Sequence, residues 1–244
     1  MIHSEDRSDG VEKGPGLSRR IVMKAAFLGA AFYSLPSAAW AFFLRMFPVR
    51  TVEKNTFRFD PATGLIRYEG APPEPYSLVV DGLVEKKLRL SYRDLRGFPQ
   101  VSQVSDFHCV EGWSVEDVRW GGIRIEELVK RTRPGAESKY VIFHALGKTR
   151  SRPGGLGNYL ESMPLKELLD PEKKCLLALD QDGKPLSHDH GAPLRLISPF
   201  DLGYKSIKYV WRIEFSARQQ PGWWTRANPI YSVNAPVPKD RLRK

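Results

Sequence analysis

The chain has 244 residues and a formal charge of +10 at pH 7. Hydrophobic residues make up 41% and charged residues 27%, which is ordinary globular usage and excludes wholesale disorder. The basic surplus suits an anionic ligand, an anionic membrane surface or nucleic acid without choosing among them.

Residues 1–41 have the pattern of a targeting segment. Arg19 and Arg20 precede an apolar run without charges, residues 25–44. Paired arginines before such a run resemble a twin-arginine (Tat) signal, which the export machinery reads. The triplet A-W-A, which ends at Ala41, is typical of a cleavage site. The alternative is a retained anchor, because about 20 residues at ~1.5 Å each span a bilayer. We therefore expect a periplasmic protein, or one anchored in the membrane and facing the periplasm.

Residues 42–74 are expected to form an extended arm, 75–230 one domain and 231–244 a C-terminal tail. Within the domain, Tyr76–Val84 predicts two strands joined by a turn at Asp81-Gly82. Further strands are predicted at 101–110, 139–146, 175–180, 193–198 and 209–215, and short helices at 91–98, 123–132 and 164–170. Strands outnumber helices without regular alternation, which favours an α+β fold with a mixed β-sheet and short helices.

The two cysteines, Cys109 and Cys175, are isolated, and no C-x-x-C pair is present. Two cysteines are too few for a disulfide scaffold. Either they pair once or at least one is kept for its thiolate. Their surroundings favour the second interpretation, because Cys175 lies in an apolar run where a small thiol packs well.

Three sequence blocks carry a resemblance to a known family. Cys109 opens the run C-V-E-G-W-S, which W-G-G-I and a helix follow. A second block, Leu186–Phe215, contains H-G-A-P-L-R-L and G-Y-K-S-I-K, and a third, weaker block is P-G-W-W-T-R-A-N-P-I. In this order they resemble the molybdenum-cofactor domain of the sulfite oxidase family, especially its small bacterial members and the periplasmic methionine-sulfoxide-reductase catalytic subunit. The resemblance covers about residues 75–230. It implies a sulfite-oxidase-type molybdopterin-binding fold and a Mo-molybdopterin cofactor.

The resemblance implies that Cys109 is both the catalytic residue and the metal ligand. Thiolate is the softest ligand that a protein offers to molybdenum, and the pterin dithiolene would supply the other sulfurs. The alternatives are a buried structural thiol and a nucleophile. A nucleophile needs a histidine in reach, but the side chain of neighbouring His108 would point to the opposite face of a strand.

The second block is expected to grip the pterin and its phosphate. Arginine offers a fork of donors, lysine offers point charges, and backbone N–H groups bind anions. The implied contacts are His190, Arg195, Lys205, Ser206, Ile207 and Lys208. A solvated basic face is the alternative. A zinc site at His188 and His190 lacks a third and fourth ligand, and His188 is expected at the surface.

Other candidates lie outside this block. Asn55, Phe57 and Arg58 resemble an Asn-aromatic stretch that touches the pterin, although an unstructured arm is the alternative. His144 is a candidate because the small bacterial relatives carry a histidine in this strand, whereas the sulfoxide-reductase relatives have a threonine where Ala145 stands. Glu111 lies where classical sulfite oxidases have arginines, which argues against sulfite as substrate.

We therefore expect an exported molybdopterin-dependent oxidoreductase that transfers an oxygen atom on a small-molecule substrate, a sulfoxide or a related oxide. The alternatives are sulfite oxidation and a metal-free anion-binding or assembly module. No C-x-x-C-H haem motif is present, so electrons would pass to or from a separate haem protein or membrane cytochrome. No nucleic-acid partner is expected. The short tail after Phe215 predicts a monomer.

Overall fold

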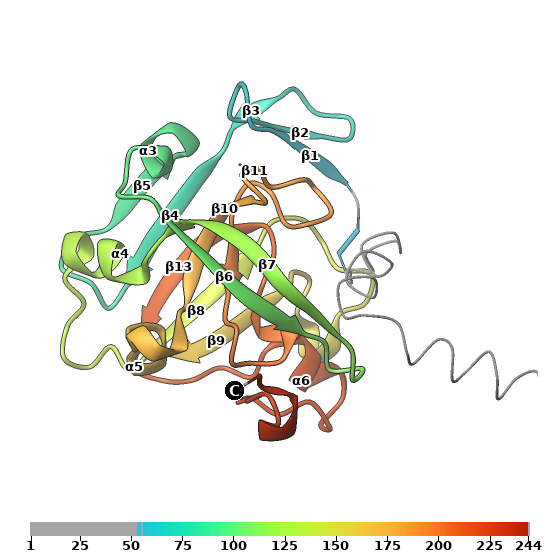
Figure 1. Ribbon diagram of the computed structural model, residues 1–244. Helices are drawn as coiled ribbons and strands as arrows, with labels where there is room; N and C mark the ends of the chain where they lie inside the picture. The colour runs from blue at the N-terminus through green and yellow to red at the C-terminus, as the bar shows by residue number, and fades with distance from the viewer. Residues whose placement is uncertain (1–52, 55, 244) are drawn as a thin grey trace, which may run out of the picture.

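A computed structural model describes residues 53–54 and 56–243. The predicted targeting segment and Asn55 lie outside the described residues. The described chain forms one three-stranded and two five-stranded sheets, with short helices at their edges (Figure 1). The predicted α+β architecture with a mixed sheet is confirmed. No helix among the described residues is long and apolar enough to cross a membrane.

The three-stranded sheet contains β1 (Phe57–Asp60), β2 (Leu65–Tyr68) and β3 (Glu74–Pro75), all antiparallel. Phe57 and Ile66 are each 2% exposed and belong to the main core. The expectation of an extended arm is therefore wrong for this part of the chain. Charged residues between the apolar residues of β1 and β2 made the strand pattern difficult to recognise in the sequence. Burial of the apolar side chains stabilises the sheet.

The second sheet has the order β11-β10-β7-β6, with β12 also paired to β10, and every pairing is antiparallel. Its strands are β6 (Val101–His108), β7 (Ser114–Ile123), β10 (Leu176–Gln181), β11 (Lys184–Pro185) and β12 (Arg195–Ile197). Strand β7 was not predicted, because glycines and charges interrupt its pattern. Gly122 allows it to approach β10, since a Cβ there would clash with the Leu177 carbonyl.

The third sheet has the order β5-β4-β13-β8-β9. Its strands are β4 (Ser77–Gly82), β5 (Leu88–Ser91), β8 (Tyr140–Ala145), β9 (Leu160–Pro164) and β13 (Val210–Ser216). Strand β13 is parallel to β4 and antiparallel to β8, which makes the sheet mixed.

The predicted turn at Asp81-Gly82 is wrong, because both residues lie in β4 and the chain reverses after them. Gly82 has a φ of +89°, and a Cβ there would clash with the Phe215 carbonyl. This glycine therefore serves the close approach of β4 to β13.

The predicted short helices are confirmed as α3 (Tyr92–Arg96), α4 (Ile125–Thr132) and α5 (Leu165–Leu168), and α6 (Trp223–Ala227) follows β13. The 3₁₀ turns are η1 (Pro153–Gly155), η2 (Pro171–Lys173), η3 (Gly203–Lys205) and η4 (Lys239–Arg241). Helix α3 begins at a capping box, in which the Ser91 hydroxyl accepts from the Asp94 N–H at 3.1 Å and the Asp94 carboxylate accepts from the Ser91 N–H at 2.8 Å.

Candidate functional site

Cys109 lies directly after β6, in the loop that leads to β7. Its N–H donates to the Trp113 carbonyl at 2.8 Å, and its own carbonyl accepts from the Gly112 N–H at 3.2 Å. The thiol is half-buried and free, and burial raises its pKa in the absence of a metal. The loop therefore fixes the backbone of Cys109 while its sulfur stays available as a ligand.

Cys175 has a different environment. It is 3% exposed, it forms no disulfide, and its Sγ lies 3.5 Å from the Ser198 hydroxyl. Burial raises its pKa to about 11, so the group is a thiol at neutral pH. The prediction of a packed structural thiol at Cys175 is confirmed.

No three His, Cys, Asp or Glu side chains gather around a possible metal position in the part of the chain that the structure describes. Cys109 is therefore not part of a multi-residue metal site among the described residues. A zinc site at His188 and His190 has no support within those residues.

Arg195, on β12, is a buried cation. Its Nη1 donates to the His190 carbonyl at 2.9 Å and its Nη2 to the Ser206 carbonyl at 3.1 Å, while its Nε has no partner. The guanidinium carbon lies 5.1 Å from the centroid of the Trp120 ring and 5.6 Å from that of Phe107. Burial lowers its pKa to about 10, and it forms no ion pair with a described carboxylate. A positive charge buried without a counter-charge is unfavourable, and an anion bound beside it would compensate this cost.

A second cation lies beside it. Lys208 is half-buried, and its Nζ donates to the Asp189 carbonyl at 2.6 Å. Burial, together with the nearby Arg195, lowers the pKa of Lys208 to about 7, although Glu53 and Asp189 act in the opposite direction. Because bringing these two cations together is unfavourable, a bound anion would stabilise both.

Gly191 brings the histidine–glycine segment onto these cations. Its φ is +106°, and a Cβ there would lie 3.0 Å from the Lys208 Cβ and 3.2 Å from the Arg195 Cβ. Any larger residue would push the segment away. His190, Gly191, Arg195 and Lys208 thus form one group, called here the Arg195 cluster. Phe107 connects it to the Cys109 loop, since Phe107 packs on Arg195 two residues before Cys109.

The N-terminal hairpin lies against the same segment. The Phe57 ring centroid is 5.1 Å from that of His188 and 5.2 Å from that of Tyr209, and Arg58 Nη1 is 3.4 Å from His188 Nε2. The Tyr209 N–H donates to the Gly191 carbonyl at 3.2 Å. Phe57 and Arg58 are therefore close to the Arg195 cluster. His188 is half-buried between rings, so its expected surface position is wrong.

Ser206 and Ile207 are buried and hold the turn between η3 and Lys208. The Ser206 hydroxyl accepts from the Ser198 N–H at 3.0 Å, and the N–H groups of Ser206 and Ile207 donate to carbonyls within the turn. These groups of Ser206 and Ile207 are therefore already used in hydrogen bonds within the protein, and the contact of both residues with a cofactor stays a prediction.

Lys205 also belongs to the interior. Its Nζ donates to Glu161 Oε2 at 2.7 Å, to the Ser162 carbonyl at 2.7 Å and to the Val233 carbonyl at 2.9 Å. All three of its N–H bonds are thereby used. The geometry makes Lys205 a structural residue that joins η3, β9 and the C-terminal segment, in place of the expected direct contact with the cofactor.

We expect Lys205→Met to lower the free energy of unfolding by about 3–5 kcal/mol, because the Glu161 carboxylate would stay buried without its counter-charge. Adding Glu161→Gln should restore much of the loss. Urea unfolding of the cofactor-free chain measures both effects. Wild-type stability of Lys205→Met would show that the ion pair contributes nothing.

His144 lies on β8, outside the Arg195 cluster. Its Nε2 is 3.0 Å from Glu214 Oε2, and Arg212 Nη1 lies 3.1 Å from the same oxygen. Directly after β8, the Leu146 N–H donates to the carbonyl of Tyr209, the residue that follows Lys208 of the cluster, at 2.8 Å. A contact between the His144 side chain and a cofactor stays a prediction that these partners do not favour.

Several residues at the site were not predicted from the sequence. Tyr209, Phe107 and Trp120 supply the rings around His188 and Arg195, and the Arg241 guanidinium donates to the Cys109 carbonyl at 3.0 Å. Tyr209 directly follows a candidate lysine and could have been suspected. Nothing in the local pattern marks Arg241.

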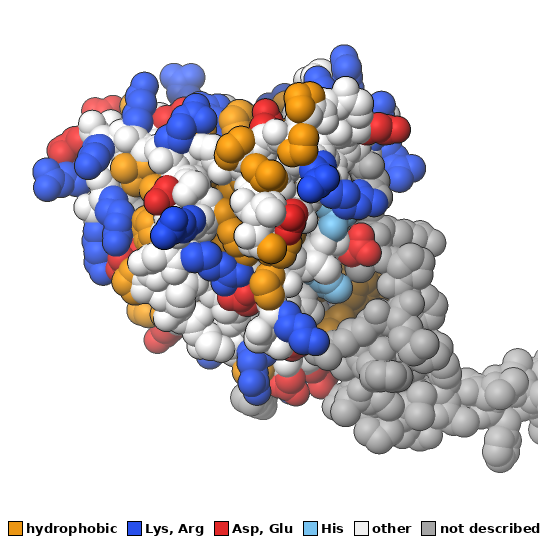
Figure 2. Space-filling model, turned by 90° about the horizontal axis from the view of Figure 1, so that it is seen from above, with side chains coloured by type: hydrophobic (Ala, Val, Ile, Leu, Met, Phe, Trp, Pro, Cys, Tyr) orange, Lys and Arg blue, Asp and Glu red, His pale blue; other side chains and the backbone are white. Residues whose placement is uncertain are grey.

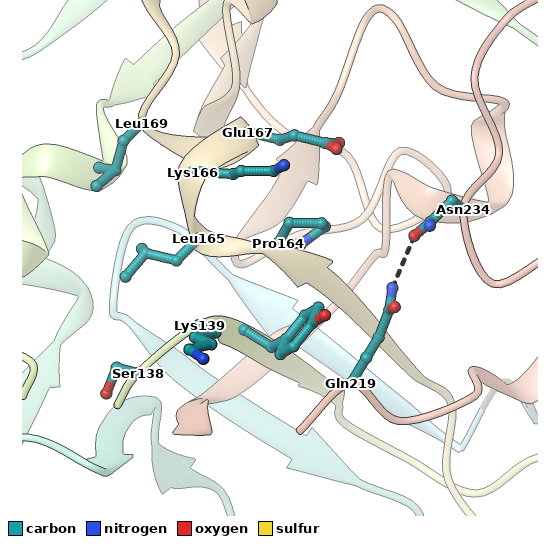
Figure 3. A pocket seen from close by; sticks show the side chains of 10 residues that line it. Ser138, Lys139, Pro164, Leu165, Lys166, Glu167, Leu169, Gln219 and Asn234 are labelled. Atoms are coloured by element: carbon teal, nitrogen blue, oxygen red, sulfur yellow. Dashed lines mark hydrogen bonds between the residues drawn. The ribbon is translucent and has the colours of Figure 1, made fainter. Parts of the chain in front are cut away.

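A cavity of about 570 Å³ lies elsewhere, between the start of β8, the junction of β9 with α5, and the C-terminal segment (Figure 3). Gln219 Nε2 donates to Asn234 Oδ1 at 2.8 Å along one side of it. None of the predicted site residues lines this cavity.

On the face drawn in Figure 2, Lys and Arg side chains are spread widely with Asp and Glu among them, so the basic surplus is not gathered into one patch there.

Fold and site together define an α+β domain with a buried basic cluster at Arg195 and one free, half-buried thiol at Cys109. The chain belongs to the family described as "Oxidoreductase molybdopterin binding domain", whose model matches residues 66–224, more than half of the 244-residue chain. It is thus a molybdenum-cofactor-dependent oxidoreductase, and the predicted membership of the sulfite oxidase and methionine-sulfoxide-reductase family is confirmed.

Three similar proteins illustrate this membership. The chain is 34% identical over 151 residues to the uncharacterized oxidoreductase YuiH of Bacillus subtilis, covering 62% of this chain and 70% of that protein. It is 31% identical over 246 residues to the protein-methionine-sulfoxide reductase catalytic subunit MsrP of Ralstonia nicotianae, covering 86% and 72%. The MsrP of Gluconobacter oxydans is 33% identical over 178 residues, covering 70% and 55%.

Among solved structures, the sulfane dehydrogenase SoxCD of Paracoccus pantotrophus aligns with a TM-score of 0.51 and 21% identity. The alignment covers 70% of this chain and 46% of that one, so this chain spans less than half of that structure. The likeness concerns the fold.

Proposed function

We propose that this oxidoreductase reduces a sulfoxide to a thioether. In the balanced reaction the sulfoxide oxygen leaves as water, and two electrons and two protons are consumed. The support is the similarity to two proteins named protein-methionine-sulfoxide reductase, one of them along 86% of this chain. When bound, the molybdenum cofactor would supply the two-electron redox chemistry of this oxygen transfer.

The cofactor is expected to be held by the residues of this site. The observation that carries this assignment is Arg195, a buried guanidinium with an unpartnered Nε and no described carboxylate beside it. A phosphate would satisfy Arg195 through a forked contact and would stabilise the charge on Lys208. Cys109 would coordinate the metal as thiolate, and metal binding would lower its pKa.

The charge near Cys109 favours a neutral substrate over sulfite. Glu111 is exposed two residues beyond Cys109, and its Oε2 accepts from Trp113 Nε1 at 3.2 Å. This carboxylate repels an anion that approaches the thiol, and its effect at Cys109 is larger than the opposite effect of Arg241, whereas a sulfoxide carries no net charge. Trp113 is 39% exposed and offers an apolar surface to a thioether side chain.

The molybdenum-loaded enzyme is expected to oxidise a reduced viologen dye when methionine sulfoxide is added, and to leave an oxidised dye unreduced when sulfite is added. Both the free amino acid and an oxidised, unfolded protein should be assayed. Turnover with sulfite alone would replace the proposed reaction by sulfite oxidation. Absence of molybdenum from protein exported by its own signal would favour a metal-free module.

Export to the periplasm and a separate electron partner, either a haem protein or a membrane cytochrome, are further parts of the proposal. They rest on Arg19 and Arg20 before an apolar run and on the lack of a haem attachment motif. Replacing Arg19 and Arg20 by lysines is expected to leave the precursor in the cytoplasm, as fractionation would measure. A precursor that still reaches the periplasm would show that the arginine pair is not read.

A further inference from the structure

The C-terminal segment, residues 231–243, runs from the turn η3 to the loop that carries Cys109. We call it the C-terminal strap. It starts near η3, where the Val233 carbonyl accepts from Lys205 Nζ at 2.9 Å and the Ala235 carbonyl accepts from the Leu202 N–H at 2.8 Å. It ends at η4, close to the β6–β7 hairpin (Figure 1). The strap lies beyond the residues that the family model matches.

Arg241 of the strap fastens the Cys109 loop. Its Nη1 donates to the Cys109 carbonyl at 3.0 Å, and its Nη2 donates to the Trp113 carbonyl at 2.8 Å. The same Nη2 is 3.2 Å from the Ser114 hydroxyl. One planar guanidinium thus holds both ends of the loop, whose backbone is already closed by the bond from the Cys109 N–H to the Trp113 carbonyl.

A second arginine keeps the strap in place. Arg243 Nε donates to Asp106 Oδ2 at 2.7 Å, and its Nη2 donates to Asp117 Oδ1 at 2.6 Å. Asp106 lies on β6 and Asp117 on β7, so Arg243 joins the two strands that carry the loop. Arg241 therefore approaches Cys109 from a segment that is anchored on both sides.

We propose that Arg241 is a positioning residue for the metal-ligating cysteine. By holding the Cys109 and Trp113 carbonyls it fixes the direction of the thiolate, and it places a positive charge next to a sulfur ligand. Such a charge favours the more reduced state of a bound metal. The inference rests on the proposed role of Cys109 as ligand, but the clamp on the loop exists without a metal.

The test compares Arg241→Ala, Arg241→Lys and Lys239→Ala in the molybdenum-loaded, full-length protein. Lys239 is an exposed residue on the same 3₁₀ turn and serves as the matched control. Hydrogen exchange across residues 109–114 should speed up in Arg241→Ala, less so in Arg241→Lys, and stay unchanged in Lys239→Ala. In Arg241→Ala the reduction potential of the molybdenum should fall, and kcat should drop by about tenfold with little change in KM.

Wild-type exchange in residues 109–114 of Arg241→Ala would overturn the clamp. Faster exchange with an unchanged potential, metal EPR signal and kcat would overturn the positioning role. If Arg241→Ala does not fold, Arg241→Lys decides by the same measurements, because lysine keeps the charge but cannot hold two carbonyls in the same plane. Full molybdenum and activity in Cys109→Ser would refute the ligand role alone and leave the exchange result standing.

Discussion

Cys109→Ser is expected to lose the bound molybdenum, about one per chain in the wild type, and to reduce turnover to background. A serine hydroxyl is a hard and very weak acid, so it does not replace a thiolate on a metal that is otherwise bound by sulfur. The loop should survive, because the bonds that close it, from the Cys109 N–H to the Trp113 carbonyl and from the Gly112 N–H to the Cys109 carbonyl, use only backbone atoms. Metal analysis, together with circular dichroism, separates loss of the ligand from loss of the fold.

Cys175→Ser is the matched control. Its thiol has a pKa of about 11 and lies in the core, so its replacement should affect stability and leave the molybdenum content unchanged. A Cys109→Ser protein with full metal content and full activity would show that the thiolate is not the ligand. Equal loss of metal in both variants would point to a general effect on folding.

Arg195→Ala is expected to lose most of the bound pterin. The change removes a forked donor from the cofactor's phosphate, and each charged hydrogen bond contributes about 1.5–3 kcal/mol. Arg195→Lys should recover only part of the pterin content, because a single ammonium does not reproduce the fork. Pterin can be measured by its fluorescence after oxidation and expressed per chain.

Part of the Arg195→Ala effect will be structural, since the His190 and Ser206 carbonyls lose their donor. Arg124 provides the comparison: it is half-buried and, like Arg195, it donates to a carbonyl, that of Cys175, from its Nη1 at 3.1 Å. We expect Arg124→Ala to lower the free energy of unfolding without changing the pterin content. Full pterin in Arg195→Ala would mean that the buried guanidinium serves the fold alone.

The local features of the fold could be predicted from the sequence. The capping box at Ser91 depends on residues three apart, and the apolar spacing of α4 places Ile125 and Leu128 in the core. The short motifs around Cys109 and Arg195 likewise indicated a molybdenum cofactor through their resemblance to a known family, because each motif lies in contiguous residues. Such signals are local, so neighbours in the sequence suffice to read them.

The features that could not be predicted from the sequence depend on contacts between residues far apart in the chain. The pair Asp81-Gly82 predicts a turn, but the Phe215 backbone lies against Gly82 within a sheet. Lys205 is predicted to bind an anion, but its ammonium pairs with Glu161. The amino-acid sequence was sufficient to predict the family and the class of cofactor, and to name Cys109 as the candidate metal ligand. The tertiary structure shows that Lys205 is already neutralised by Glu161, whereas the buried Arg195 has an Nε without a partner. The reason is physical: the state of a charge depends on what burial places next to it, and burial is set by contacts that no local pattern records.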